Sequence, residues 1–377
     1  MKKILFIFGT RPEAIKMAPT INYFKKDKVN FKTLVVVTAQ HREMLDQVLS
    51  VFNIVPDYDL NLMTKNQRLE DITGKILKEI SNLLIDLVPD LIFVQGDTTT
   101  TYAASLAAFY QKIPVAHIEA GLRTNNIYSP FPEEINRRMT TVISKYHFPP
   151  TSDGENNLLS EGVNQRNIVV SGNTVIDALL SVSSKIDSEE KRYKKYFYKN
   201  YDIKFDNLKT ILVTGHRRES FGDGFENICE ALEQVVTTNP VQIIYPVHLN
   251  PNVQRPVKRI LDGLPNVYLI PPQDYVPFIF LMKKSHIILT DSGGVQEEAP
   301  SLAKPVLVMR ETTERSEGVE SGTARLVGTK KENIINEIST LLNDPSKYNA
   351  MAKSANPYGD GNASKIIYKF ILSVNSN

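Results

Sequence analysis

The sequence has no tryptophan, one cysteine and almost no excess of charge of either sign. A single cysteine, Cys229, excludes an internal disulfide and a thiolate metal cluster, and its helical surroundings predict a small buried apolar residue. With 44 Lys and Arg against 42 Asp and Glu, the chain offers no general field that would attract nucleic acid or an anionic membrane. No apolar run approaches the roughly 20 residues that span a bilayer. We therefore expect a cytoplasmic protein with neither partner.

Short apolar segments alternate with amphipathic helical patterns along the chain, which is typical of α/β proteins with parallel sheets. Helices are predicted at 69–87 and 363–374. A chain of 377 residues exceeds one ordinary core. The alternation restarts after a polar stretch, 185–209, for which a solvated helical face with aromatic anchors is the better interpretation. We predict two doubly wound Rossmann-like domains with a boundary near Gly172 and a cleft between their strand ends. The expected strands are 4–8, 34–38, 91–94, 115–118, 146–148 and 168–171, then 211–214, 243–246, 267–270, 287–290, 306–309 and 325–327.

Three carboxylates follow expected strands or begin an expected helix in the first half: Asp97, Glu119 and Glu133. Ligands of open α/β sheets bind beyond the carboxyl ends of the strands, where acids are well placed to move protons. Each has a structural alternative. Asp97 could cap the helix that follows it, Glu119 could pair with Arg123, and Glu133 could interact with a helix dipole. Three acids converging on one cleft favour an enzyme.

The segment after the first expected strand predicts an anion site. Gly9 allows a tight turn, and Thr10 with Glu13 fits a capping box. Pro12 suits the first helical turn, and Arg11 and Lys16 supply two cations. Free helix N–H groups and both cations would then lie together at the edge of the sheet. The second and third glycines of a dinucleotide fingerprint are absent. Ordinary helix-start chemistry with two surface cations is the alternative.

A second anion site is predicted where the strand at 287–290 meets two glycines and a helix. Backbone N–H groups from Ser292 through Gly293 and Gly294 could approach phosphate oxygens, because glycine removes side-chain obstruction. Glu298 could accept hydrogen bonds from ribose hydroxyls. A plain tight turn is the alternative. Phe278 lies in an aromatic stretch that could stack on a flat base, although most aromatic residues of helices belong to the core.

A histidine and two arginines follow the strand at 211–214. His216, Arg217 and Arg218 suit a diphosphate leaving group better than a core. A salt bridge between Arg218 and Glu219 is the structural alternative. His248 is balanced between a capping role and a ligand contact.

Metal binding and a serine nucleophile are both poorly supported. The six histidines show no metal-binding spacing, no Asp-x-Asp pair occurs, and no G-x-S-x-G elbow is present. We expect neither a metal nor a cofactor.

Several long runs together resemble the non-hydrolysing UDP-N-acetylglucosamine 2-epimerases. They include FGTRPEAIKMAP at 8–19, QGDT at 95–98, HIEAGLR at 117–123, PFPEEINRR at 130–138, GHRRE at 215–219 and TDSGGVQEEAP at 290–300. The resemblance covers nearly the whole chain. It implies a glycosyltransferase-B-like fold in which the C-terminal helix returns to the first domain. The domains would then be 1–171 plus 362–377, carrying the catalytic carboxylates, and 172–361, binding UDP.

The resemblance also implies a reaction, partners and residue roles. The enzymes interconvert UDP-N-acetylglucosamine and UDP-N-acetylmannosamine, feed bacterial surface polysaccharides and are usually homodimers. Functional positions of the family match Arg11, Lys16, Asp97, Glu119, Glu133 and His216, with Ser292 and Glu298 at UDP and Phe278 at the uracil.

Some relatives bind a second substrate molecule as an activator, near the position of Gln40. Glu43 and Asn66 stand where a glutamine and an arginine would be expected, which weakens the case for activation here. Gln40, Arg217 and His248 are the candidate regulatory residues.

The C2 hydrogen of the sugar lies next to no ketone, so breaking the C1–O bond must acidify it. The sequence thus predicts that UDP leaves as the proton leaves, giving a 2-acetamidoglucal to which UDP is added back. Arg11, His216 and the helix start after Ser292 would stabilise the diphosphate, and Lys16 would orient the acids. The rival functions are a hydrolysing epimerase, a glycosyltransferase and a non-catalytic sugar-nucleotide sensor.

Overall fold

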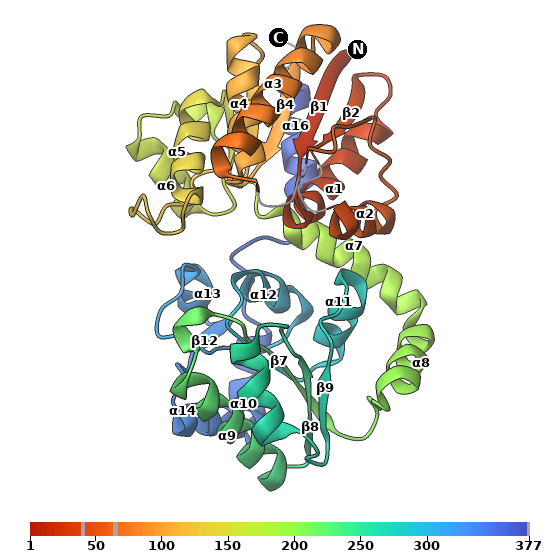
Figure 1. Ribbon diagram of the computed structural model, residues 1–377, viewed down its shortest axis with the longest axis vertical. Helices are drawn as coiled ribbons and strands as arrows, with labels where there is room; N and C mark the ends of the chain where they lie inside the picture. The colour runs from red at the N-terminus through yellow and green to blue at the C-terminus, as the bar shows by residue number, and fades with distance from the viewer. Residues whose placement is uncertain (39–41, 63–66, 375–377) are drawn as a thin grey trace. The chain divides into compact units, whose positions relative to one another are not determined.

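The computed structural model describes residues 1–38, 42–62 and 67–374 of the chain. It divides into two compact units, Met1–Ala178 with Tyr358–Asn377, and Leu179–Pro357 (Figure 1). Each unit contains a six-stranded sheet in which the paired strands run parallel, in the orders β3-β2-β1-β4-β5-β6 and β12-β11-β10-β7-β8-β9. The two orders are the same topology, because in each the first strand of the unit lies between the second and the fourth. Two doubly wound Rossmann-like domains are therefore confirmed.

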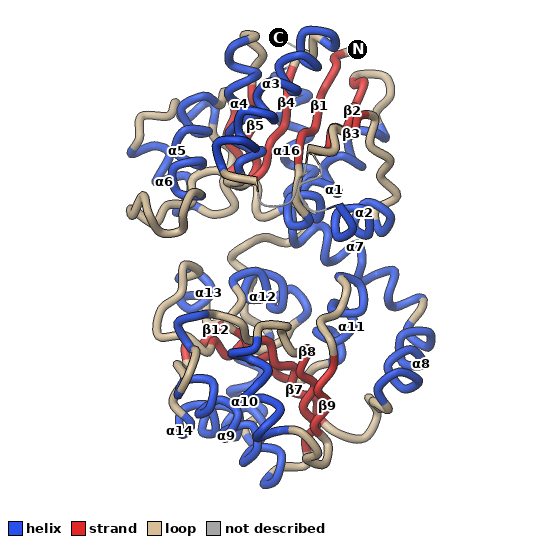
Figure 2. The backbone as a smooth tube through the Cα atoms, in the orientation of Figure 1, coloured by secondary structure: helices blue, strands red, loops and turns tan. Residues whose placement is uncertain are grey.

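In the first unit, strands and helices alternate along the chain (Figure 2). The strands are β1 (Lys2–Phe8), β2 (Phe31–Val37), β3 (Tyr58–Asp59), β4 (Leu91–Gln95), β5 (Val115–Ile118) and β6 (Tyr146–Phe148). The helices are α1 (Arg11–Lys26), α2 (Arg42–Val51), α3 (Leu69–Leu87), α4 (Thr99–Tyr110), α5 (Glu133–Ile143), α6 (Ser152–Ser160), the 3-10 turn η1 (Gln165–Asn167), α7 (Thr174–Ser188) and α16 (Ala363–Val374). The division between the units falls within α7.

The second unit repeats the alternation. Its strands are β7 (Lys209–Thr214), β8 (Val241–Pro246), β9 (Val267–Ile270), β10 (Ile287–Thr290), β11 (Val306–Val308) and β12 (Ala324–Leu326). Its helices are α8 (Glu190–Tyr201), η2 (Arg218–Ser220), α9 (Asp223–Thr238), α10 (Pro251–Leu261), α11 (Tyr275–Lys284), α12 (Gly293–Glu298), η3 (Ala299–Leu302), α13 (Ser316–Glu320), α14 (Lys331–Asn343) and α15 (Pro345–Ala352).

Alternate side chains of β1 pack into two separate cores, as expected for a strand covered on both faces. Leu5 and Ile7 join one cluster with the buried stripe of α3 and the alanines of α4. On the other face Phe6 stacks on Phe93 with ring centroids 4.6 Å apart and meets Phe24 of α1 edge-on. Residues 4–8 of the strand are therefore apolar without interruption, which explains why the sequence predicted them.

Helix α16 completes the first unit from the far end of the chain. Its Ile367 and Ile371 are fully buried, and the ring of Tyr368 meets that of Phe24 edge-on with centroids 5.3 Å apart. The Asp177 carboxylate accepts hydrogen bonds from the backbone N–H groups at the start of the helix, at 3.2 Å from Ala363 and 2.8 Å from Ser364. Residues 363–374 thus belong to the first unit.

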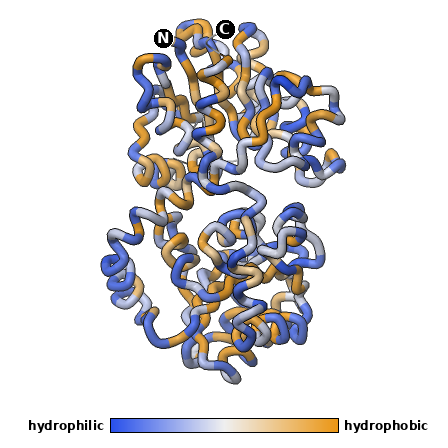
Figure 3. Tube along the Cα trace, turned by 180° about the vertical axis from the view of Figure 1, so that it is seen from behind, coloured by the Kyte–Doolittle hydropathy of each residue, from blue (hydrophilic) through white to orange (hydrophobic). Residues whose placement is uncertain are grey.

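The core of the second unit lies between its sheet and α9, α10 and α14. Cys229 is buried in this core, and burial raises the pKa of its thiol to about 12, so the prediction of a structural cysteine is confirmed. Helix α8 accounts for much of the polar stretch and is largely hydrophilic in Figure 3. Its Phe197 is fully buried and stacks on Phe280 at 5.5 Å, which confirms a solvated helix with aromatic anchors.

Two strand predictions differ from the structure. Residues 168–171 form no named strand, because Ile168 makes one isolated bridge to His147 before the chain turns toward α7. The short strand β3 was not predicted, since two residues carry no periodicity. Within the described residues, no helix is long and apolar enough to cross a membrane.

Candidate active site

The strand order of each sheet reverses at one place, between β1 and β4 in the first unit and between β7 and β10 in the second. In doubly wound sheets, ligands bind at this switch point, beyond the carboxyl ends of the strands. Arg11 and Asp97 follow β1 and β4, whereas His216 and Ser292 follow β7 and β10. These four predicted residues therefore lie at the switch point of their own unit.

The turn from β1 into α1 is fixed by Glu13, which is 1% exposed. The predicted capping box with Thr10 is present. The carboxylate also accepts a hydrogen bond of 2.7 Å from the hydroxyl of Thr98 and one of 3.1 Å from the Gly9 N–H. Burial raises the pKa of Glu13, against the effect of these hydrogen bonds. Glu13 thereby joins the loops that carry Arg11 and Asp97, a role that the capping-box pattern did not reveal.

Asp97 is not a helix cap. Thr98 caps α4 instead, accepting a 3.1 Å hydrogen bond from the N–H of Thr101. The Asp97 carboxylate lies 2.5 Å from Nη2 of Arg137. Burial raises the pKa of Asp97, the Arg137 guanidinium opposes that rise, and the negative charge of Glu119 reinforces it. The capping alternative is therefore wrong, and Asp97 is a partly buried acid beside a second acid.

Glu119 stands directly after β5. Its backbone φ is 61°, in the left-handed region that residues other than glycine rarely adopt. Its Oε1 lies 2.5 Å from Nζ of Lys16, and its other oxygen accepts a hydrogen bond from Gln95. Arg123 pairs at 2.6 Å with Glu161 rather than with Glu119. The structural alternative for Glu119 is therefore wrong, whereas the predicted association of Lys16 with the acids is present.

Glu133 is the first residue of α5 and is partly buried. Among the described residues, no hydrogen bond or ion pair links Glu133 to Asp97 or Glu119, whereas the charge of Glu119 acts on Asp97. The neighbouring Glu134 is fully buried and bound by Arg138 at 2.9 Å and Arg137 at 3.4 Å. These contacts make Glu134 a structural carboxylate.

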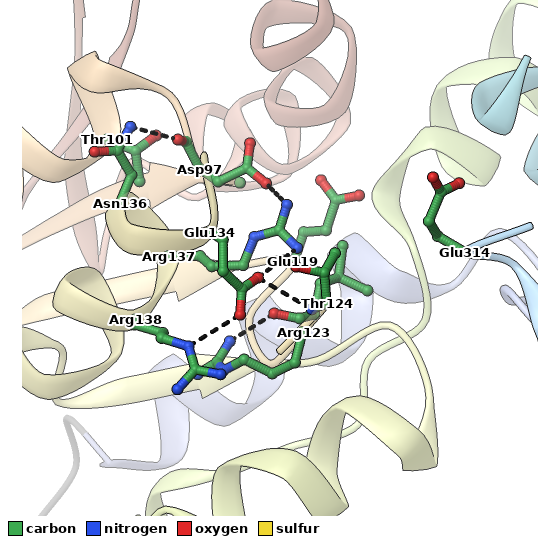
Figure 4. A network of polar contacts seen from close by, with 12 residues as sticks. Asp97, Thr101, Glu119, Arg123, Thr124, Glu134, Asn136, Arg137, Arg138 and Glu314 are labelled. Atoms are coloured by element: carbon green, nitrogen blue, oxygen red, sulfur yellow. Dashed lines mark hydrogen bonds and ion pairs between the residues drawn. The ribbon is translucent and has the colours of Figure 1, made fainter. Parts of the chain in front are cut away.

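His117 and Asn136 support the loop that carries Asp97, and neither was predicted. His117 is fully buried, with Nε2 placed 2.7 Å from the carbonyl oxygen of Gly96. Burial lowers the pKa of His117 to about 3, so the ring is neutral and its Nε2–H donates to that carbonyl. Asn136 donates a 3.0 Å hydrogen bond to the carbonyl of Asp97 itself, as Figure 4 shows.

In the second unit, the buried Asp291 organises the residues that follow β7. Its carboxylate accepts hydrogen bonds of 2.6 Å from the backbone N–H of His216 and 2.8 Å from that of Arg217. Burial alone would raise the pKa of Asp291, but these hydrogen bonds and the His216 ring lower it. The ring of His248 stacks on that of His216, with centroids 5.5 Å apart. His216 and His248 are thus neighbours, which their separation in sequence did not indicate.

The predicted Gly-Gly start of α12 follows β10 directly. A Cβ atom on Gly293 would lie 3.1 Å from the guanidinium of Arg315, whereas one on Gly294 would meet little within 4 Å. Glu298 is buried at the end of α12, with the hydroxyl of Tyr275 placed 3.4 Å from its Oε1. Phe278 is half-buried on α11, outside the aromatic pairs of the core.

The candidate regulatory residue Gln40 lies outside the residues that the structure describes, and so does Asn66. Arg217 is described, and its Nε is buried without a hydrogen-bond partner there. No group of three or more His, Cys, Asp or Glu side chains that could hold a metal ion occurs in the ranges that the structure describes.

The residues that sequence reasoning missed in these sites are Gln95, His117, Asn136, Arg137, Tyr275, Asp291 and Arg315. Arg137 and Asp291 lay within runs that the sequence had singled out, but a run does not show which side chain its members contact. Their partners are distant in the sequence, as Asp97 and Arg137 show with a separation of 40 residues.

Two Rossmann-like units, one with paired carboxylates and cations at its switch point and one with an ordered histidine loop and a Gly-Gly helix start, define a two-domain α/β enzyme. A family model described as UDP-N-acetylglucosamine 2-epimerase matches residues 24–372. The UDP-N-acetylglucosamine 2-epimerase of Escherichia coli (strain K12) is 58% identical over 362 residues, which make up 96% of this chain and 96% of that protein.

Solved structures agree with the sequence comparisons. A crystal structure of UDP-GlcNAc 2-epimerase from Neisseria meningitidis bound to UDP-GlcNAc has a TM-score of 0.89 and 54% identity, over 98% of this chain and 100% of that one. A structure of UDP-GlcNAc 2-epimerase from Methanocaldococcus jannaschii has a TM-score of 0.85 and 35% identity, over 98% and 99% of the two chains. The chain belongs to the UDP-N-acetylglucosamine 2-epimerase family and is an epimerase.

Proposed function

We propose that the protein interconverts UDP-N-acetylglucosamine and UDP-N-acetylmannosamine without net hydrolysis. The observation that carries this proposal is the pair of carboxylates, Asp97 and Glu119, each bound to its own cation beyond the neighbouring strands β4 and β5 of the first unit. Inversion at C2 requires one group to remove a proton and another to deliver one. The comparison with the N. meningitidis enzyme bound to UDP-GlcNAc supports this substrate.

The chemistry begins with cleavage of the C1–O bond, because the C2 hydrogen lies next to no carbonyl. A base takes the C2 proton, the C2–H electrons form the C1–C2 double bond, and the C1–O electrons leave with UDP. The intermediate is a 2-acetamidoglucal. Return of a proton to the other face of C2 and of UDP oxygen to C1 completes the epimerisation, and no electrons are gained or lost.

We assign the proton transfers to the acids of the first unit, Asp97, Glu119 and Glu133. Such a group typically contributes about 10²–10⁴-fold to the rate. Lys16 holds the Glu119 carboxylate through the 2.5 Å ion pair and offsets its charge.

We assign the nucleotide mainly to the second unit. His216 and the backbone N–H groups from Ser292 to Gly294, together with Arg11, would stabilise the charge that develops on the diphosphate. Glu298 would accept from the ribose hydroxyls, and Phe278 would contact the uracil.

The experiment that tests the reaction follows the anomeric proton signals of UDP-N-acetylglucosamine mixed with the purified protein in deuterated water. We expect signals of both UDP-sugars, with deuterium incorporated at C2. Retention of the original hydrogen would exclude proton exchange. Free N-acetylmannosamine would identify a hydrolysing enzyme. Release of UDP only in the presence of an acceptor would identify a glycosyltransferase. Binding without turnover would identify a sugar-nucleotide sensor.

Asp97→Asn tests the acid–base role in the same reaction. We expect turnover to fall by at least about a hundredfold, because an amide cannot exchange a proton at these pH values. Asn136→Asp would not serve as a control, because Asn136 donates a hydrogen bond to the carbonyl of Asp97. Asp153→Asn, on exposed surface in α6, is the matched control and should retain activity. Near-normal turnover of Asp97→Asn would remove Asp97 from the proton transfers.

We also propose a homodimer, supported by an apolar face on α5. Ile135, Met139 and Val142 are 42%, 42% and 83% exposed and recur at helical spacing along one side. Sedimentation velocity should show a dimer, and Val142→Asp should shift it toward monomer. A monomeric wild-type protein would refute this proposal.

The pathway and its regulation rest on the resemblance. We propose that the product feeds surface polysaccharides, which requires that loss of the gene removes N-acetylmannosamine-derived residues from the cell surface. Arg217 and His248 are proposed as regulatory residues, and a hyperbolic dependence of rate on substrate would argue against that role. A cytoplasmic location stays a prediction.

A further inference from the structure

The two acids of the first unit differ in the cation that each one contacts. Glu119 is bound to a lysine, whereas Asp97 is bound to an arginine at 2.5 Å. A lysine can lose its proton in a protein, but an arginine cannot. The charge beside Asp97 is therefore permanent over the working pH range.

We propose that Arg137 is a positioning residue that fixes the orientation of the Asp97 carboxylate and keeps it ionised for proton abstraction. This inference rests on the proposed proton role of Asp97. It adds a residue that makes no proposed contact with substrate and acts only through its neighbour.

The guanidinium is held from both sides, so its own position is fixed. Nη2 contacts Asp97, and Nη1 lies 3.4 Å from the fully buried carboxylate of Glu134 (Figure 4). Glu134 is fixed in turn by the 3.1 Å hydrogen bond from the backbone N–H of Thr124 and by Arg138. Arg137 is only 9% exposed. The planar guanidinium, which lies between two carboxylates, fixes the orientation of the Asp97 carboxylate and also places a positive charge beside it.

The charged groups that face Asp97 come from three elements of the first unit. They are Arg137 from α5, Glu119 after β5 and Lys16 from α1. Burial raises the pKa of Asp97, and Arg137 is the largest opposing influence. Removing Arg137 would therefore raise the pKa further. Because the base must be ionised, the acid limb of the rate profile would then move to higher pH.

The test compares kcat and kcat/KM from pH 5 to 9 for the full-length enzyme and four variants: Arg137→Gln, Arg137→Lys, Arg138→Gln and Asp97→Asn. Arg138 is the matched control, because it neighbours Arg137 on the same helix and pairs with Glu134, but does not contact Asp97. We expect Arg137→Gln to lower kcat at least about tenfold and to move the acid limb of kcat/KM upward by about one pH unit. Arg138→Gln should leave that limb in place.

Arg137→Lys separates charge from geometry. It keeps a cation, so the acid limb should stay near the wild-type pH, but kcat should fall because one ammonium cannot reproduce the fork. A wild-type kcat in Arg137→Lys would overturn the orienting role. An unmoved limb in Arg137→Gln, or equal shifts in Arg137→Gln and Arg138→Gln, would overturn the electrostatic role. Should Arg137→Gln not fold, the Arg137→Lys result decides the orienting role.

The failure of this inference can be distinguished from that of the proposed function. Near-normal turnover of Asp97→Asn would refute the proton role itself, whatever Arg137 does. An inactive Asp97→Asn together with an unmoved limb in Arg137→Gln would refute only the role of Arg137. A carboxyl-carbon NMR titration of Asp97, identified by the signal missing from Asp97→Asn, measures the same effect without turnover.

Discussion

Nζ of Lys16 lies 2.5 Å from Oε1 of Glu119, and the two side chains are only 16% and 6% exposed. The ion pair joins the first turns of α1 to the end of β5, two segments that meet only in the folded sheet. Glu119 is also held in a left-handed backbone conformation, which costs roughly 1–3 kcal/mol unless the surroundings impose it. Lys16 is part of those surroundings.

Replacing Lys16 by methionine should therefore impair both activity and stability. The loss of one partner leaves a buried carboxylate uncompensated, which typically costs about 3–5 kcal/mol. We expect kcat to fall at least about a hundredfold and the urea midpoint to decrease. Lys26→Met, an exposed cation at the end of the same helix, should do neither. Unchanged kcat in Lys16→Met would show that the pair is dispensable.

Acid should destabilise the fold through its two buried histidines in the first unit. A free histidine gains a proton near pH 6.5, but burial lowers the pKa of His117 to about 3 and of His147 to about 4. Protons therefore bind the unfolded chain first as the pH falls. The stability contributed by the neutral rings is fully present above pH 6.5. As the pH falls from 6.5 to the folded pKa values, this stability is lost. Each ring accounts for a loss of up to about 1.4 kcal/mol per pH unit.

Urea midpoints measured from pH 8 to pH 5 test this linkage. His147→Gln should flatten the dependence below pH 6.5, since glutamine has no proton to gain. His248→Gln, on exposed surface, should leave the slope as it is. Equal slopes for wild type and His147→Gln would mean that the buried ring does not titrate as described.

Asp291→Asn should weaken UDP binding. The carboxylate fixes the backbone of His216 and Arg217 through two charge-assisted hydrogen bonds, each worth roughly 1.5–3 kcal/mol. An amide oxygen carries no full charge and would hold the loop less firmly. We expect the Kd for UDP, measured by calorimetry, to rise about tenfold or more, with Asp262→Asn at an exposed helix end as control. An unaltered Kd would contradict the loop's role.

Two glycine-to-alanine changes should have opposite effects on the free energy of unfolding. A Cβ on Gly215 would lie 3.2 Å from Oη of Tyr245 and 3.3 Å from atoms of Met309 and Phe225. This crowding should cost about 1–3 kcal/mol. Gly74 lies within α3 with nothing within 4 Å of the added atom, so alanine there should gain about 0.5–1 kcal/mol. Urea unfolding of both variants measures the difference, and destabilisation of Gly74→Ala would contradict it.

The fold was predictable because the central strands of each sheet, such as β1, β4 and β10, hold runs of buried apolar residues. Helix 69–87 was predicted with its observed bounds, since Ile72, Ile76, Ile80 and Leu84 form one buried stripe. The two-residue strand β3 has no such pattern. Residues 168–171 are apolar but make a single bridge, because the chain leaves the sheet edge there to begin α7.

The site was predictable as a set of residue types but not as a set of contacts. Strand ends placed Asp97 and Glu119 at one edge of a sheet, which the topology confirms. Their partners could not be predicted, because Arg137 is 40 residues from Asp97 and Lys16 is 103 residues from Glu119. The left-handed backbone conformation of Glu119 could not be predicted either, because a glutamate at this position gives no indication of it.

The return of α16 to the first unit has a consequence for biosynthesis. A ribosome completes residues 179–357 before it makes the helix that covers Phe24 and docks on Asp177. Part of the aromatic core of the nascent first unit therefore stays uncovered until residues 363–374 emerge. Premature termination shortly before residue 363 should therefore yield a product in which the later half is folded and the earlier half is prone to aggregate.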